Sequence, residues 1–206
     1  MPDIFLVIFS YLLGSLPSGY LVALAAGGLD IRERGSGNPG AANVFHVLGA
    51  GPGLTTLIAD ILKGYLPVYL AQHCAGSDAR LVLLCGAAAI CGHTWMLFLR
   101  FNGGKAVATT AGVFLALSPT AMLPTITIFA VTVWISGHIS IGSISSSALF
   151  PLITIVMRTP PHTTGLAFLS CILILIRHIS NVEHLRKYCE EDYDTGSELE
   201  KIREIQ

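Results

Sequence analysis

The sequence predicts an all-α fold, a polytopic transmembrane helical bundle of about seven spans. Hydrophobic residues make up 52% of the 206 residues and charged residues only 12%, whereas a soluble domain carries about 25% charged residues because its surface must meet water. Apolar runs also recur along the whole chain, between short polar connections. A surface so poor in charge suits lipid, and the net charge of −1 argues against nucleic acid as a partner.

Seven apolar runs are the expected spans, and a helix needs about 20 residues to cross the hydrocarbon core. The first three runs meet this length, whereas the last four have 13 to 17 residues and are marginal. A marginal run needs tilting or backbone that dips inward against protein, so five spans is the alternative count. The runs cover residues 3–27, 52–73, 81–99, 106–118, 120–136, 144–157 and 164–177.

The distribution of Lys and Arg predicts the orientation, because cytoplasmic connections carry the excess of positive charge. With the N-terminus outside, the inner connections and the tail hold nine Lys and Arg residues against two in the outer connections. Seven spans then place the C-terminus inside. We expect a single membrane-integral domain over residues 1–206, with a mixed-charge cytoplasmic tail at 183–206. The inner connections are 28–51, 100–105, 137–143 and the chain after 177.

The connection RERGSGNPGAANVFH, residues 32–46, has the composition of an anion-binding loop. Gly37 and Gly40 let backbone N–H groups approach a ligand closely, and Ser36 and Asn43 add neutral donors. A helix that begins here would point its positive end at the loop. The alternative is a flexible turn between two spans. GSGNPG also matches the dinucleotide-binding pattern, but that pattern requires a preceding strand, and here an apolar span precedes it.

A second anion-binding arrangement is predicted where another span opens, in GHTWMLFLRFNGGKAVAT, residues 92–109. Gly103, Gly104 and Lys105 place a cation beside pliable backbone at a helix start. The alternative for Lys105 is a lysine that merely extends its ammonium to the membrane interface. His93 lies inside a span, where a single histidine is more often a packed, hydrogen-bonded residue than a catalyst.

Two further polar groups fall in the inner connections. Ser140 and Ser143 are three residues apart and share a helix face, although serines in membrane helices often bond to their own backbone. His178 and Asn181 are also three apart, at the inner end of the last span. Histidine is the side chain best suited to move a proton near neutral pH. The alternative is a histidine that only complements the helix dipole.

Asp60 and Lys63 lie one helical turn apart in the middle of a span. Charges at that depth are expensive and must pair or line a polar cavity. We interpret them as a structural ion pair near the floor of the site, with a transport or proton-relay role as the alternative. The five cysteines form no C-x-x-C motif, so no metal site is expected.

Taken together, the motifs GSGNPGAANV, ADILKG, GH followed by F-x-GGKAVAT, ISIGS and the terminal H-x-x-N resemble the bacterial acyl-phosphate:glycerol-3-phosphate acyltransferases. The resemblance covers roughly residues 10–187, and the order and spacing of the motifs make coincidence improbable. It implies a seven-helix membrane enzyme of the bacterial cell (inner) membrane with its active site at the cytoplasmic face.

The implied reaction transfers a fatty acyl group from acyl phosphate to the 1-hydroxyl of sn-glycerol 3-phosphate, the first acylation of phospholipid synthesis. The products are 1-acyl-sn-glycerol 3-phosphate and phosphate. The resemblance implies no cofactor, no metal and no acyl-CoA. The expected partners are the acyl phosphate donor, the glycerol 3-phosphate acceptor and membrane lipid, with the soluble enzyme that makes acyl phosphate as a further candidate.

The resemblance also implies roles for particular residues. His178, Asn181 and Lys105 are the expected catalytic group, in which His178 and Asn181 orient the acceptor and Lys105 stabilises the departing phosphate. The proton goes to His178 or to a substrate phosphate oxygen. The expected substrate- and phosphate-binding residues are Ser36, Gly37, Asn38, Gly40, Asn43, His46, Gly103, Gly104 and Ser143.

This chain departs from the family pattern at several positions. His46 stands where arginine is usual, which removes a bidentate phosphate ligand. Ala42 replaces threonine, Asn102 replaces lysine and Ala106 replaces glycine. A divergent paralogue that acylates another phosphorylated alcohol is therefore an alternative. The rivals from other classes are a transporter of phosphate or organic phosphates and a non-catalytic lipid-binding subunit.

Overall fold

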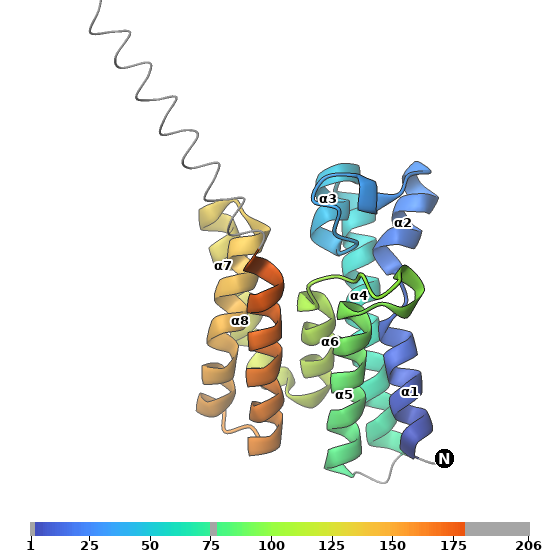
Figure 1. The fold of residues 1–206 in the computed structure, drawn as a ribbon. Coiled ribbons are helices and arrows are strands. Elements are labelled where there is room, and N and C mark those ends of the chain that lie inside the picture. Colours follow the sequence, from blue (N-terminus) through green and yellow to red (C-terminus); the bar gives the residue numbers. More distant parts are fainter. Residues whose placement is uncertain (1–2, 75–77, 180–206) are drawn as a thin grey trace, which may run out of the picture.

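The computed structural model describes residues 3–74 and 78–179, which form a bundle of upright helices (Figure 1). Every regular element among these residues is a helix, as the sequence predicts. The start of α1 and the end of the last helix lie at opposite ends of the bundle (Figure 1). The predicted tail lies outside the described residues. The helices are α1 (Asp3–Gly14), α2 (Ser18–Gly27), α3 (Ala41–Leu48), α4 (Ala50–Cys74), α5 (Ala79–Thr94), α6 (Val107–Leu117), α7 (Pro119–Ser136), α8 (Ile139–Val156) and the C-terminal helix Pro161–Ile179, with 3-10 turns η1 (Ile31–Glu33) and η2 (Leu97–Leu99).

Six helical segments of the described chain are long and apolar enough to cross a membrane, against the seven spans predicted. The difference is the predicted span 106–118, which forms α6, a helix of only 11 residues. At 1.5 Å per residue α6 rises about 16 Å, roughly half the hydrocarbon core. Figure 1 shows the chain before it, residues 95–106, crossing the bundle below α2 and α3. This passage therefore begins as backbone packed inside protein and only ends as helix.

The first predicted span, 3–27, is divided into α1 and α2 by a break at residues 15–17. Pro17 has no N–H to donate and its ring opposes a continuous helix. The break leaves the carbonyl of Leu16 outside the helical hydrogen-bond pattern, and this oxygen accepts hydrogen bonds from the Ser18 N–H at 2.9 Å and from Lys63 Nζ at 2.8 Å. A lysine of α4 thus compensates for the interrupted backbone of the first span.

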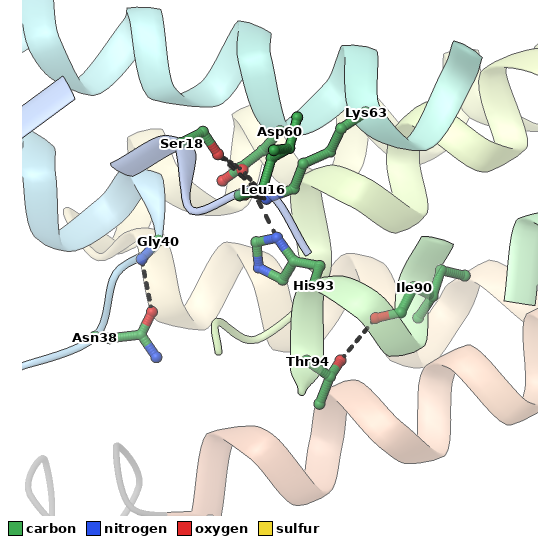
Figure 2. A network of polar contacts seen from close by, with 9 residues as sticks. All are labelled: Leu16, Ser18, Asn38, Gly40, Asp60, Lys63, Ile90, His93 and Thr94. Atoms are coloured by element: carbon green, nitrogen blue, oxygen red, sulfur yellow. Dashed lines mark hydrogen bonds and ion pairs between the residues drawn. The ribbon is translucent and has the colours of Figure 1, made fainter. Parts of the chain in front are cut away.

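A buried polar network surrounds this break (Figure 2). Asp60 and Lys63 of α4 form the predicted ion pair, with 2.8 Å between Nζ and Oδ1, and both are almost fully buried. Ser18, in the first turn of α2, donates a hydrogen bond to the same Asp60 oxygen, and Lys63 donates to the Ser18 hydroxyl at 3.2 Å. His93 of α5 approaches from the other side, with Nδ1 3.6 Å from Asp60 Oδ1. Three segments of the chain therefore meet at one carboxylate.

Glycines bring two helix pairs into close contact. A methyl group added at Gly64 or Gly112 would overlap the backbone of the facing helix, so α4 and α6 approach at both positions. Gly14 and Gly92 play the same part between α1 and α5. Small residues at helix interfaces are the usual means of association in a membrane, where no hydrophobic force drives helices together. This close packing places α6 directly beside α4, and α5 directly beside α1.

The outer surface of the bundle is apolar. Large hydrophobic side chains are exposed along α1, α4, α7, α8 and the C-terminal helix, and Trp134 of α7 is 85% exposed. An apolar surface of this extent fits lipid rather than water. The interior is closed by contacts such as that between Phe114 of α6 and Phe150 of α8, whose rings meet edge to face with centroids 4.6 Å apart. The chain is a multi-pass membrane protein.

We predict that the Asp60–Lys63 pair is needed as a pair. Asp60→Leu leaves the buried Lys63 ammonium without its carboxylate, and we expect a loss of about 3–5 kcal/mol in the free energy of unfolding. The double variant Asp60→Leu/Lys63→Met removes both charges, and we expect a clearly smaller loss. Thermal unfolding of the detergent-solubilised protein would measure both. A double variant as unstable as the single one would contradict the prediction.

Candidate active site

Asn43 holds the first glycine-rich loop in shape from beneath. Its side chain is buried in the first turn of α3, and its Oδ1 accepts a hydrogen bond from the Ser36 N–H at 2.9 Å. A buried amide bonded to this much backbone fixes the shape of the loop, while Ser36 itself stays exposed on the loop surface. The Asn43 Nδ2 donates at 2.9–3.2 Å to the carbonyls of Ile31, Arg34 and Asn38.

Two glycines give this loop its backbone conformation. Gly35 and Gly37 have φ angles of 57° and 69°, in the left-handed region that residues with a Cβ rarely adopt. The Asn38 Oδ1 accepts a hydrogen bond from the Gly40 N–H at 2.9 Å, which closes the turn before α3 (Figure 2). Because α3 begins directly after Gly40, the positive end of the helix adjoins the loop. Loop and helix start have the arrangement predicted for an anion.

Arg32 is held beside this loop by two neighbours. Its guanidinium pairs with the Asp30 carboxylate at 2.5–3.1 Å and lies 5.1 Å from the centroid of the Tyr20 ring. The guanidinium lowers the pKa of Asp30, so this carboxylate stays charged at neutral pH. Pairing and ring contact together restrict a side chain that would otherwise be free in solvent.

The second loop carries Lys105 on glycines packed against the end of α5. The Gly104 N–H donates to the His93 carbonyl at 3.0 Å. Methyl groups added at Gly103 or Gly104 would overlap the last residues of α5, so only glycine allows this approach. Lys105 is half-buried just before α6. Burial and the positive charge of Arg177 lower the pKa of Lys105 to about 8.

The C-terminal helix adds two side chains from the other side. Arg177 Nη2 donates a hydrogen bond to the Gly103 carbonyl at 2.9 Å, which ties the helix to the second loop. His178 is buried, and its Nδ1 lies 2.8 Å from the carbonyl oxygen of Ile174. A carbonyl can only accept, so Nδ1 carries the hydrogen, and Nε2 holds the lone pair of the neutral ring.

A polar cleft of about 370 Å³ lies between the two loops and the C-terminal helix. It unites four predicted site residues with two guanidinium groups. A hydroxyl, two amide side chains and two guanidinium groups around one cleft suit a phosphate group. The lining residues are Arg32, Ser36, Gly37, Asn38, Pro39, Asn102, Gly103 and Arg177.

Other predicted residues lie beside or apart from this cleft. Gly40 and Asn43 support the first loop, and Gly104 supports the second. His46 is exposed in the last turn of α3 and does not line the cleft. Ser143 is buried in the first turns of α8, where its hydroxyl donates to the Ile139 carbonyl at 2.9 Å. This is the alternative noted above, a serine of a membrane helix that bonds to its own backbone. Asn181 lies outside the described residues.

Sequence reasoning missed four of the residues that line the cleft, and two of these, Arg32 and Arg177, are charged. Arg32 opens the first motif and Arg177 directly precedes His178, yet neither is among the site residues that the sequence predicts. Basic residues next to a predicted anion-binding motif were the available signal. The contact between Arg177 and Gly103 joins residues 74 positions apart, which no local pattern indicates.

The fold and the cleft define a class, a multi-pass membrane protein with a polar cleft, lined by two arginines, at one end of its helical bundle. Within residues 3–74 and 78–179, no group of three or more His, Cys, Asp or Glu side chains could hold a metal ion. The family model described as glycerol-3-phosphate acyltransferase matches residues 4–188. The chain belongs to the glycerol-3-phosphate acyltransferase family.

Relatives and solved structures agree with this assignment. The glycerol-3-phosphate acyltransferase of Geobacter sulfurreducens is 38% identical over 191 residues, which cover 93% of this chain and 97% of the relative. That of Endomicrobium trichonymphae is 43% identical and covers 87% of this chain and 89% of the relative. A crystal structure of PlsY (YgiH), an integral membrane glycerol 3-phosphate acyltransferase in its glycerol 3-phosphate form, superposes with a TM-score of 0.85 at 35% identity, over 91% of this chain and 93% of that one.

The backbone before α6 generates a stability prediction. Ala106 has φ 61° and a buried side chain. Ala106→Gly relieves about 1 kcal/mol of left-handed strain and loses about 0.8 kcal/mol of methyl burial, so we expect a nearly neutral change. Ala108→Gly, two residues on within α6, lacks this relief and should lose about 1 kcal/mol. Thermal unfolding compares the two, and equal losses would contradict the prediction.

The lowered pKa of Lys105, about 8, predicts a pH-dependent affinity. The ammonium attracts phosphate only while it is protonated, so charge and affinity are present below pH 8 and decline above it. A phosphate monoester is already dianionic above pH 7 and adds little to the change. We expect binding of glycerol 3-phosphate, measured by equilibrium dialysis, to weaken between pH 7 and 9. In Lys105→Arg this decline should disappear, because arginine stays charged. The same decline in both proteins would contradict the assignment.

Proposed function

We propose that this chain transfers a fatty acyl group from acyl phosphate to the 1-hydroxyl of sn-glycerol 3-phosphate. The products are 1-acyl-sn-glycerol 3-phosphate and inorganic phosphate. The observation that carries the proposal is the cleft in which the loops of Ser36 and Gly103 face each other between Arg32 and Arg177. Both substrates are phosphorylated, and the cleft and the neighbouring Lys105 together offer the donors that two phosphate groups need.

The reaction follows from the placement of these groups. The acceptor hydroxyl attacks the acyl carbonyl, a new ester C–O bond forms, and the bond from the acyl carbon to the phosphate oxygen breaks. Lys105 stabilises the negative charge that grows on the departing phosphate. The proton of the hydroxyl goes to Nε2 of His178 or to an oxygen of a substrate phosphate. Asn181, three residues after His178 in the sequence, would help to orient the acceptor.

The charge of the cleft supports activity despite the change at His46. Histidine in place of arginine removes a guanidinium from α3, but position 46 is exposed and is not among the residues that line the cleft. Arg32 and Arg177 supply guanidinium groups at the cleft itself. The phosphate-binding capacity of this chain therefore depends on these two residues, together with Lys105, rather than on position 46.

The membrane setting fits the substrates. Glycerol 3-phosphate is soluble in water, whereas the acyl chains of donor and product require lipid, and the cleft lies at one end of a bundle with an apolar outer surface. The excess of Lys and Arg in the connections predicts that this end is cytoplasmic in a bacterial cell membrane. The soluble enzyme that makes acyl phosphate would then deliver its product to this face.

A transporter of organic phosphates is the rival in the same membrane. The buried charges that suggested it, Asp60 and Lys63, are paired and bonded to Ser18 and Leu16. They hold helices together instead of lining a passage. In sealed vesicles, uptake of labelled glycerol 3-phosphate without acylation would favour the transporter.

A product assay on the purified protein tests the proposal. We expect lysophosphatidic acid from glycerol 3-phosphate and acyl phosphate, and none when acyl-CoA replaces acyl phosphate. Lys105→Ala and His178→Ala should each lower kcat/KM at least about a hundredfold, as losses of charge stabilisation and of acceptor positioning do. Arg80→Ala, which removes an exposed cation at the start of α5 that does not line the cleft, is the matched control and should stay within a few-fold of wild type. Folded protein that gives no product with either donor would refute the proposal.

A further inference from the structure

His93 fills the space between the buried carboxylate of Asp60 and the backbone of Gly104. Only 2% of the residue is exposed. One edge of its ring points to Asp60, with Nδ1 3.6 Å from Oδ1 (Figure 2). The opposite edge faces Gly104, because a methyl group added there would overlap Nε2. The His93 carbonyl also accepts the Gly104 N–H at 3.0 Å. Ring and backbone of one residue therefore support the same glycine.

The loop that carries Lys105 depends on this support. Gly103 and Gly104 have no side chains with which to anchor themselves, so their position follows from what their backbone packs on. Gly103 lies on the carbonyls of His93 and Thr94, and Gly104 lies on the His93 ring. A shift of the ring moves Gly104, and Lys105 is the next residue. A displacement of about 1 Å at a catalytic group can lower a rate about a hundredfold.

The His93 ring lies against a carboxylate that is itself held in place. Lys63 and Ser18 both bond to the Asp60 carboxylate, and the three are anchored in α4 and at the start of α2. His93 Nδ1 is buried and has no hydrogen-bond partner among the described residues. A buried imidazole nitrogen without a hydrogen bond costs free energy in a membrane interior. The Nδ1 edge of the ring faces the Asp60 carboxylate. The Nε2 edge therefore faces Gly104 in the loop.

We propose that His93 is a positioning residue for acyl transfer, which couples the fixed carboxylate of Asp60 to Gly104 and so sets the position of the Lys105 ammonium at the cleft. The inference rests on the proposed reaction, in which Lys105 stabilises the departing phosphate. His93 itself touches no substrate. It acts through Lys105, and its effect must therefore vanish when Lys105 is removed.

A double-mutant cycle tests this dependence. His93→Asn keeps a polar atom near Asp60 but leaves a void under Gly104, and we expect kcat/KM for acyl transfer to fall roughly tenfold to a hundredfold. In a Lys105→Ala background the same substitution should change kcat/KM less than about twofold, because residues that act as a unit are not additive. His93→Gln reaches Gly104 and should recover part of the loss. An equal loss in both backgrounds, or none in either, would overturn the proposal.

Thr94→Val is the matched control. Thr94 is the neighbouring buried polar residue, and its hydroxyl donates only to the Ile90 carbonyl of its own helix at 3.0 Å (Figure 2). The variant disturbs the end of α5 without touching the contact between His93 and Gly104. We expect a small loss of thermal stability and kcat/KM within about threefold of wild type. A loss as large as that of His93→Asn would mean that any disturbance here lowers activity, and would overturn the proposal.

Two further measurements keep the test independent of folding and of the proposed reaction. If His93→Asn does not fold, Gly104→Ala disturbs the same contact from the loop side and should show the same dependence on Lys105. Labelling of Lys105 by an amine-reactive reagent, followed by peptide mass spectrometry, needs no turnover. We expect labelling in His93→Asn to be roughly threefold faster or more, since the loop is released. Unchanged labelling would overturn the positioning role, whereas absent transferase activity in wild type would refute only the proposed function.

Discussion

The buried carboxylate of Asp60 is the constraint on which the rest of the molecule depends. A charge in the interior of a membrane protein must be paired and hydrogen-bonded, because desolvation costs several kcal/mol. One partner, Lys63, lies in the same helix as Asp60, and two come from other segments: Ser18 from the start of α2 and His93 from α5. Satisfying one charge therefore fixes the break in the first span and the end of α5 relative to α4. Both glycine-rich loops of the site follow directly from elements fixed in this way.

The site built on this frame consists largely of backbone. Ser36, Gly37 and Gly103 bring main-chain groups to the cleft, and buried side chains such as Asn43 hold that main chain in place. Burial and the neighbouring Arg177 lower the pKa of Lys105 to about 8, so this cation makes recognition of an anion pH-dependent near pH 8. The loops therefore supply the shape of the cleft, and Lys105 supplies a cation whose charge depends on pH.

The sequence predicted the parts of this arrangement better than their assembly. Membrane helices, both loops and the Asp60–Lys63 pair follow from composition, glycine spacing and the cost of burying charge. The shortness of α6 did not, because the apolar run 106–118 reads the same whether helix or packed backbone precedes it. The support that Asn43 gives to its loop and the contact of Arg177 with Gly103 were also missed. A local sequence motif identifies a polar residue of interest, but the tertiary fold determines whether its side chain contacts a ligand or a backbone carbonyl.

The half-length of α6 explains how a polar cleft can coexist with an apolar bundle. Had the passage been helical throughout, its first turns would lie at the height of α2 and α3 and fill the space of the cleft. Instead residues 95–106 cross the bundle below that level and are stabilised by bonds to α5 and the C-terminal helix (Figure 1). Lys105 then stands at the positive end of α6, so helix dipole and ammonium act on the same anion. Shortening one helix places the cation of the site within the protein and leaves the flanking helices free to contact lipid.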